Sequence, residues 1–165
     1  MENEKKEDDL ALKIEVWKKV VDVQMHFNEL CLKVRNFAVS ILGALLGAAA
    51  IAYRFAGQVD VLSLKVPTAS IFVIISIVVW LGFFLMDRYW YHELLKGAVH
   101  HGQRIEDLLR ARMPEIDLAH AIRDQSHESL KMNTAKKLNI FYLSIFAVQV
   151  LALVALLFGA VRLAS

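Results

Sequence analysis

Three histidines and an aspartate of this 165-residue chain have the types and the spacing of a metal site or a protonation sensor. They are His26, His101, Asp124 and His127, and His120 shares one helix face with Asp124 and His127 at steps of four and three residues. Each of His26, His101 and His127 lies about 11 to 15 residues from the end of the nearest apolar run, counted along its predicted helix. At equal rise per residue, these positions fall in one layer. Imidazole and carboxylate groups bind Zn²⁺ and other borderline metals. Because the sequence has neither an HExxH motif nor the paired Cys and His spacing of zinc sites, a solvated polar face is the alternative interpretation.

Two uncharged polar side chains and a pair of glycines lie inside the apolar runs. Ser76 and Gln149 are near the centres of two runs, where a buried amide needs a partner on a neighbouring helix or in a wet pore. Gly43 and Gly47 form a GxxxG motif, which lets helix backbones approach closely, within one protomer or between protomers. No catalytic residue and no cofactor-binding motif is predicted, so the chain is expected not to be an enzyme.

Three uncharged apolar runs predict three membrane spans. The runs cover residues 36–53, 66–86 and 140–161. As a helix, the 21 residues of the second run are about 31 Å long and match a hydrocarbon core of about 30 Å. With flanking residues, the spans are predicted at 37–56, 66–86 and 139–161, in a single domain that covers residues 1–165.

Lysine and arginine are distributed unequally between the segments that connect these runs. Of the 19 basic residues, 16 lie before the first run or between the second and third runs. Because cytoplasmic loops carry the excess of these residues, we expect a multi-pass protein of the bacterial inner membrane, with a cytoplasmic N-terminus and a periplasmic C-terminus. Acidic residues interleave with the basic ones, so the expected partner is the lipid bilayer and not nucleic acid.

The apolar pattern also continues beyond the spans. A stripe with alternating steps of four and three residues is predicted to be buried. Its members are Val16, Val20, Val23, Phe27, Leu30, Val34, Phe37 and Ile41. Because the stripe crosses from the soluble part into the first span, one continuous helix is expected there, and Gly57 is expected to end it.

Three long helices follow from these boundaries. The cytoplasmic parts are an arm at 10–36 and a helical hairpin at 87–138, and a third helix is predicted from Pro114 to about Arg162. The predicted fold class is an all-α membrane protein with three long helices in an up-down-up antiparallel bundle. Each helix spans the bilayer and extends into a cytoplasmic helical stalk.

Segments 17–39 and 87–106 carry a pattern of residues that is similar to a known family. The residues are Trp17, His26, Phe27, Asn28, Arg35, Asp87, Tyr91, Leu94, Leu95, Gly97 and Glu106. The pattern resembles small multi-span bacterial membrane effectors of anti-phage defence, of the kind linked to retrons and to cyclic-nucleotide signalling. The resemblance implies a protein that a partner keeps inactive and that permeabilises the inner membrane on release.

Three classes of function are compatible with these features. The leading hypothesis is a non-enzymatic effector that forms a homo-oligomer and permeabilises or depolarises the inner membrane, in a defence or toxin context. The second is a membrane-anchored scaffold whose stalk recruits a cytoplasmic protein partner. The third is a lipid-modifying enzyme that uses the histidine layer at the membrane surface. Membrane potential after induced expression separates the first two, and metal content tests the third.

Overall fold

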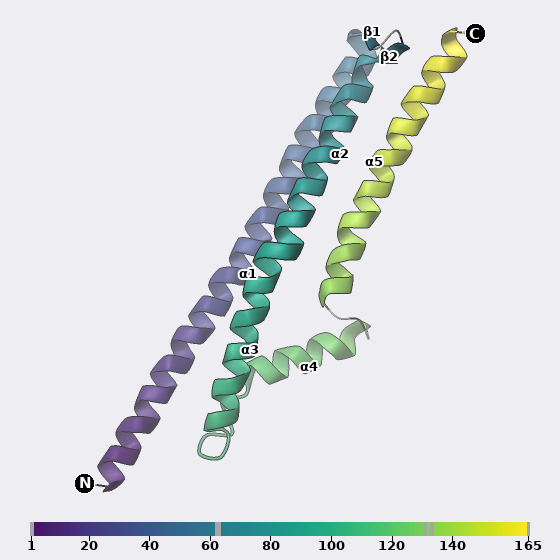
Figure 1. Cartoon of the computed structure of the whole chain (residues 1–165). Coiled ribbons are helices and arrows are strands. Elements are labelled where there is room, and N and C mark those ends of the chain that lie inside the picture. The colour runs from purple at the N-terminus through teal and green to yellow at the C-terminus, as the bar shows by residue number, and fades with distance from the viewer. Residues whose placement is uncertain (1, 62–63, 131, 133, 165) are drawn as a thin grey trace. The chain divides into compact units, whose positions relative to one another are not determined.

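The computed structural model describes residues 2–61, 64–130, 132 and 134–164, with the side chains of 4–61, 65–125, 132 and 134–159. Over these residues the chain is mostly helical, as predicted (Figure 1). Among them, three helical stretches are long and apolar enough to cross a membrane: Glu4–Phe55, Thr68–Leu109 and Thr134–Gly159. Contacts divide the chain into unit 1 (Met1–Leu32 and Arg88–Lys137) and unit 2 (Lys33–Asp87 and Leu138–Ser165).

Helix α1 (Glu2–Phe55) is unbroken, because it contains no proline and a long apolar run continues its polar part. It ends at the predicted place, since Gly57 has a φ of 63°, a left-handed conformation that glycine adopts without strain. A β-hairpin that sequence patterns did not indicate follows, in which β1 (Gln58–Val61) pairs antiparallel with β2 (Leu64–Pro67). The backbone N–H of Thr68 donates to the Gly57 carbonyl at 3.1 Å and closes this connection.

The second apolar run forms a helix that continues well beyond the run. α2 (Thr68–Met86) passes through a π-helical turn, η1 (Asp87–Tyr91), directly into α3 (His92–Leu109) (Figure 1). A loop then leads to α4 (Leu118–Leu130), and α5 is Thr134–Ala164. The single third helix predicted from sequence is therefore wrong, because the polar segment and the apolar segment form separate helices.

The core of unit 2 is formed by side chains of α1, α2 and α5. Its buried residues are Ala38, Leu42, Trp80, Leu138 and Tyr142. The rings of Trp80 and Tyr142 have centroids 4.9 Å apart, and the Trp80 indole N–H donates to the Tyr142 carbonyl at 3.0 Å. This bond satisfies the indole donor inside an apolar core and sets the register of α2 against α5.

The core of unit 1 joins α1, α3 and the loop before α4. Its buried residues are Ile105, Leu109 and Ile116. The helices α1 and α3 approach closely at Gly102, where a Cβ would collide with the side-chain amide of Gln24. That amide donates to the Ala98 carbonyl at 3.2 Å, so it cannot move away without losing a hydrogen bond.

We expect Gly102→Leu to lower the free energy of unfolding by about 1–3 kcal/mol, which is the usual cost of overpacking a close contact. Gly97→Leu is the matched control on the same helix, since nothing lies within 4 Å of a Cβ at Gly97. This control should stabilise the chain by up to about 1 kcal/mol, because leucine favours a helix more than glycine does. Thermal unfolding of the purified chain, followed by circular dichroism, measures both, and equal effects would contradict the close approach at Gly102.

The apolar stripe predicted for α1 is wrong at several of its positions. Val16 and Val23 are exposed, and Phe37 is 62% exposed. The residues of α1 that are buried in unit 2 are instead Ala38, Leu42, Ala49 and Ala52. Small residues let helix backbones approach closely, which accounts for the alanine-rich face of α1 that packs in unit 2.

Candidate functional site

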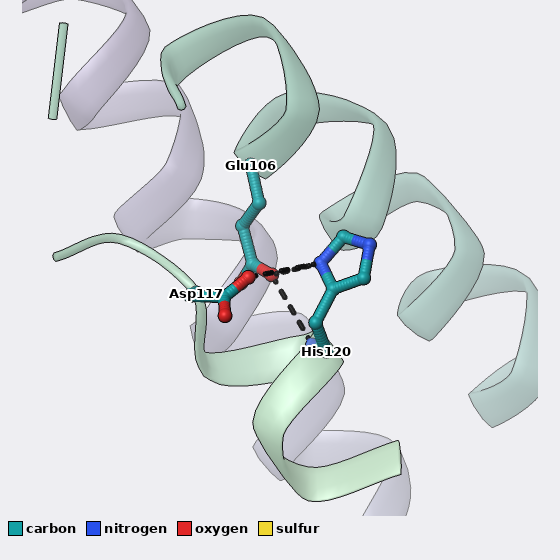
Figure 2. Close-up of side chains that lie close together, drawn as sticks. All are labelled: Glu106, Asp117 and His120. Carbon is teal, nitrogen blue, oxygen red and sulfur yellow. Dashed lines mark hydrogen bonds and ion pairs between the residues drawn. The ribbon is translucent and has the colours of Figure 1, made fainter. Parts of the chain in front are cut away.

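The buried carboxylate of Glu106 lies at the centre of a polar cluster in unit 1, together with Asp117 and His120 (Figure 2). Glu106 lies on the last turn of α3 and is 2% exposed. It shares the buried face of this helix with its neighbours Ile105 and Leu109, so the carboxylate is directed into the core. Asp117 and His120 lie on either side of the first residue of α4 and approach it from the next helix.

Both oxygens of Glu106 accept hydrogen bonds from N–H groups. The backbone N–H of Ala119 donates to Oε1 at 2.9 Å and to Oε2 at 3.1 Å, and that of His120 donates to Oε2 at 3.4 Å. The indole N–H of Trp17 on α1 donates to Oε1 at 3.2 Å. The first N–H groups of a helix have no partner inside the helix and carry the positive end of its dipole. Glu106 therefore caps α4 from another helix and ties it to α1 and α3.

The imidazole of His120 lies among three carboxylates. Its Nδ1 is 3.1 Å from Oε2 of Glu106 and 3.3 Å from Oδ1 of Asp117, and its Nε2 is 3.6 Å from Oδ1 of Asp107. Asp117 also forms an ion pair with Arg110 at 3.2 Å. Each ring nitrogen of His120 therefore has a carboxylate oxygen within 3.6 Å. The junction between α3 and α4 is thus held by charges of both signs.

The same three residues have the donor set of a divalent metal site. Glu106, Asp117 and His120 each offer one ligand atom, and these atoms lie within 4.8 Å of one another. Two carboxylates and an imidazole suit Zn²⁺ and related ions. However, the Glu106 oxygens already accept four hydrogen bonds from N–H groups, and the Asp117 carboxylate binds Arg110. A metal would have to displace these donors, so the contacts fit a helix cap better.

Of the residues that the sequence singled out for a metal site, only His120 joins this cluster. His26, His101 and Asp124 are exposed, and the side chain of His127 lies outside the described residues. Within the part of the chain that the structure describes, Glu106, Asp117 and His120 are the one group of three such residues whose ligand atoms converge. The histidine-layer prediction therefore rests on sequence spacing alone.

Sequence spacing also missed a second cluster, which lies in unit 2. Asp87 is the first residue of η1 and is fully buried. Its carboxylate accepts a hydrogen bond from Nε of Arg35 at 2.7 Å, a second from Nη2 at 3.3 Å, and a third from the Tyr142 hydroxyl at 3.1 Å. This two-pronged contact is the geometry in which arginine binds a carboxylate most strongly. The cluster links α1, η1 and α5 directly beside the uncharged runs.

A signal for this cluster was present in the sequence. Arg35 directly precedes the first uncharged run, and Asp87 directly follows the second. On antiparallel helices these two positions fall at the same end of the apolar segments. Opposite charges at matching boundaries are therefore a signal for such a pair, one that helix periodicity does not use.

The two predicted mid-membrane polar residues are both buried but differ in their hydrogen bonding. The Ser76 hydroxyl donates to the Val73 carbonyl at 2.8 Å, within its own helix. Gln149 is 1% exposed, and neither atom of its amide has a hydrogen-bond partner among the described residues. The buried hydroxyl of Ser70 also has none there. Unit 2 thus holds unsatisfied polar groups in an apolar setting.

Gln149 lies at the level of these serines along the helices. It follows Tyr142 on α5 by seven residues, and Val73 precedes Trp80 on α2 by seven. Because Trp80 and Tyr142 are in contact and their helices run in opposite directions, Gln149 and Val73 both lie about 10.5 Å farther along. Ser70 and Ser76, within one turn of Val73, are therefore the polar groups of α2 nearest to the Gln149 level.

Gly43 and Gly47 lie on an exposed face of α1. Nothing lies within 4 Å of a Cβ placed on either glycine. The described contacts therefore give this motif no packing role within the chain, whose α1 packs through its alanine-rich face. Self-association through the two glycines stays a prediction.

The chain was compared with known proteins at the level of family, sequence and structure. It matches no protein-family model, no curated protein and no solved structure. The functional interpretation therefore depends on the chain's own residues and their contacts.

Proposed function

We propose that this chain is a non-enzymatic protein of the bacterial inner membrane that self-associates and permeabilises or depolarises the membrane, in a defence or toxin context. Three spans cross the bilayer as an up-down-up bundle, with a cytoplasmic N-terminus, a helical cytoplasmic stalk and a periplasmic C-terminus. The three apolar helical stretches support this arrangement, as does the excess of Lys and Arg on one side.

The observation that carries the proposal is the unsatisfied amide of Gln149. In an apolar core, an amide without a hydrogen-bond partner costs about 1–3 kcal/mol. Water or a polar side chain from another protomer would remove that cost, so a rearranged, hydrated assembly is favoured over the closed single chain. The nearby Ser70 hydroxyl adds a second group with the same tendency. Polar groups that line a shared interior lower the barrier to water entry.

The exposed glycine face supplies the surface for self-association. With no side chain above Gly43 and Gly47, a second helix can approach the α1 backbone closely, and close packing is what drives helix association in lipid. The buried alanine-rich face of α1 already serves the chain's own packing. Protomers can therefore first associate through the glycines with the unit 2 core intact, and the rearrangement that hydrates Gln149 follows.

Induced expression with a potential-sensitive dye tests this function. Wild-type protein should depolarise cells, and Gly43→Ile, Gly47→Ile and Gln149→Leu should each remove most of the effect, because they block helix approach or remove the polar group. Gly82→Ile is the control for the glycines, since nothing lies within 4 Å of a Cβ at Gly82 on α2. Ser144→Ala on the exposed face of α5 is the control for Gln149→Leu. All variants should reach the membrane at equal levels by immunoblot.

The alternative is a membrane-anchored scaffold that recruits a cytoplasmic protein. Exposed large apolar side chains in unit 1, Leu12 on α1 and Leu108 on α3, favour this alternative, because they offer contact area to a partner. Harmless wild-type protein at high expression would contradict the effector proposal and favour the scaffold. Loss of depolarisation in the two control variants as well would contradict the specific roles of Gly43 and Gln149.

A further inference from the structure

Unit 1 contains a cavity of about 640 Å³ that is separate from the Glu106 cluster. Its walls come from α1, from η1 and α3, from α4 and from the first residues of α5. Ligand sites in proteins usually have volumes of about 300–1,000 Å³, so a small molecule fits this space.

The walls of the cavity are largely apolar. The larger apolar side chains that line it are Val21, Met25, Leu95, Val99, Leu118 and Ile122. Several of these remain in contact with water, since Met25 is 55% and Ile122 is 58% exposed. Exposed apolar surface that faces a shared space is stabilised when another apolar group covers it. The cavity therefore favours an occupant with a hydrocarbon part.

The charged side chains that line the cavity are mainly positive. Arg88, Lys96 and Arg123 contribute three cations, against one carboxylate, that of Glu93. Glu93 forms ion pairs with two of these cations: its Oε1 is 3.1 Å from Nη1 of Arg88, and its Oε2 is 3.5 Å from Nζ of Lys96. The hydrogen bond from Arg88 lowers the pKa of Glu93, which keeps this carboxyl charged at neutral pH. Arg123 is also paired, its Nε lying 2.9 Å from Oδ1 of Asp124, which is outside the lining. The three cations still outnumber these two carboxylates, and a surplus of positive charge attracts an anionic group.

One edge of the cavity lies where an apolar helix meets water. Arg88 comes two residues after the last residue of α2, and the exposed aromatic residues Tyr89 and Trp90 follow it. Tyrosine and tryptophan at the end of a spanning segment lie in the lipid headgroup layer. Lys96, eight residues farther along, is about 12 Å away along the helix. The positive side chains thus extend from the headgroup level into the cytoplasmic side.

We propose that this cavity binds an amphiphile with a single acyl chain and an anionic head group, either a carboxylate or a phosphate. The apolar wall holds the hydrocarbon, and Arg88, Lys96 and Arg123 hold the anion. A single chain with its head group suits the volume, whereas a complete diacyl phospholipid is too large for it. The ligand enters from the adjacent membrane surface, where such molecules concentrate. This site is independent of the proposed permeabilising function.

Native mass spectrometry of the full chain in a non-ionic detergent tests the site. The probes are oleate, oleoyl lysophosphatidate, the zwitterionic oleoyl lysophosphatidylcholine and inorganic phosphate. One oleate or one lysophosphatidate should bind per chain, and the difference between the two tells which head group the site prefers. Lysophosphatidylcholine should bind at least about tenfold more weakly, and inorganic phosphate should not bind, because it has no apolar part.

Substitutions in the lining separate this site from general binding. Lys96→Gln and Arg123→Gln should each weaken anion binding by roughly three- to tenfold, and Val99→Trp should abolish it by filling the space. Lys19→Gln is the control, since this lysine is on α1 outside the lining and its side chain is 81% exposed. Far-UV circular dichroism verifies folding, and the two charge variants decide the outcome if Val99→Trp does not fold.

Three results would overturn the proposal. Equal binding to wild type and to folded Val99→Trp would place the amphiphile in the detergent belt. An equal loss in Lys19→Gln and Lys96→Gln would mean that surface charge alone attracts the ligand. A changed oligomeric mass of lipid-free Val99→Trp would show that another copy of the chain occupies the space.

Discussion

Asp87→Ala is expected to lower the free energy of unfolding by about 3–5 kcal/mol, the usual cost of breaking one side of a buried ion pair. The substitution removes the acceptor of both Arg35 hydrogen bonds and of the Tyr142 hydroxyl, inside a fully buried site. Arg35 is 28% exposed at its side chain, so partial hydration favours the lower end of this range. Denaturation of the full chain in a non-ionic detergent, followed by circular dichroism, measures the loss.

Two further variants test whether the loss of stability is specific to this site and whether Arg35 and Asp87 are energetically coupled. Asp60→Ala, at an exposed position in β1, is the matched control and should change stability by less than about 0.5 kcal/mol. The double variant Arg35→Met with Asp87→Leu should recover much of the stability, because apolar residues of similar volume often replace a buried pair at little cost. If the double variant were as unstable as the sum of its single variants, the two residues would not be energetically coupled.

Glu106→Ala is expected to release the start of α4 from the rest of unit 1. Hydrogen bonds to a charged acceptor contribute about 1.5–3 kcal/mol, and loss of a helix cap costs about 1 kcal/mol. A local loss of about 3 kcal/mol corresponds to roughly 100-fold faster hydrogen exchange at the amides of Ala119 and His120. Trypsin should also cleave faster after Arg110 and Arg112. These residues lie in the loop between α3 and α4, which becomes more mobile once the hydrogen bonds between Glu106 and the α4 backbone are lost.

A second substitution separates the effect of the Glu106 charge from the effect of its hydrogen-bond acceptor. Glu106→Gln keeps one acceptor oxygen for the Ala119 N–H but loses the charge, so its effect should be intermediate. Glu115→Ala, at an exposed position in the same loop, is the matched control and should leave exchange in α4 unchanged. Unchanged exchange at Ala119 in Glu106→Ala would refute the capping role.

The helices next to the apolar runs were predictable because hydrophobic length and helix-ending residues act locally. α2 is Thr68–Met86, against a predicted span of 66–86, since Pro67 is the N-cap residue directly before the helix and the charge of Asp87 ends the apolar run. Gly57 ends α1 because glycine adopts the left-handed backbone conformation found there. The hairpin between them was missed because its two strands have only four residues each, and a two-stranded hairpin alone is a weak sequence signal.

The polar clusters were harder to predict because their members are far apart in the chain. Arg35 and Asp87 are separated by 52 positions, and Trp17 and Glu106 by 89. Periodicity within one helix tells which residues share a face, but it does not show which residue of another helix lies opposite. Counting residues from the membrane edge placed His26 and His101 in one layer without determining their direction, and both are exposed.

The π-helical turn η1 separates two sequence patterns that share one helix. Buried positions of α2 recur in steps of three and four, as in Val73, Ser76 and Trp80, and those of α3 do so again at Gly102, Ile105 and Leu109. Between Asp87 and His92, which are both buried, the step is five.

In an α-helix one additional residue rotates the buried face by about 100°, and a wider π turn takes up that residue. The apolar segment and the polar segment can therefore each keep their own repeat phase.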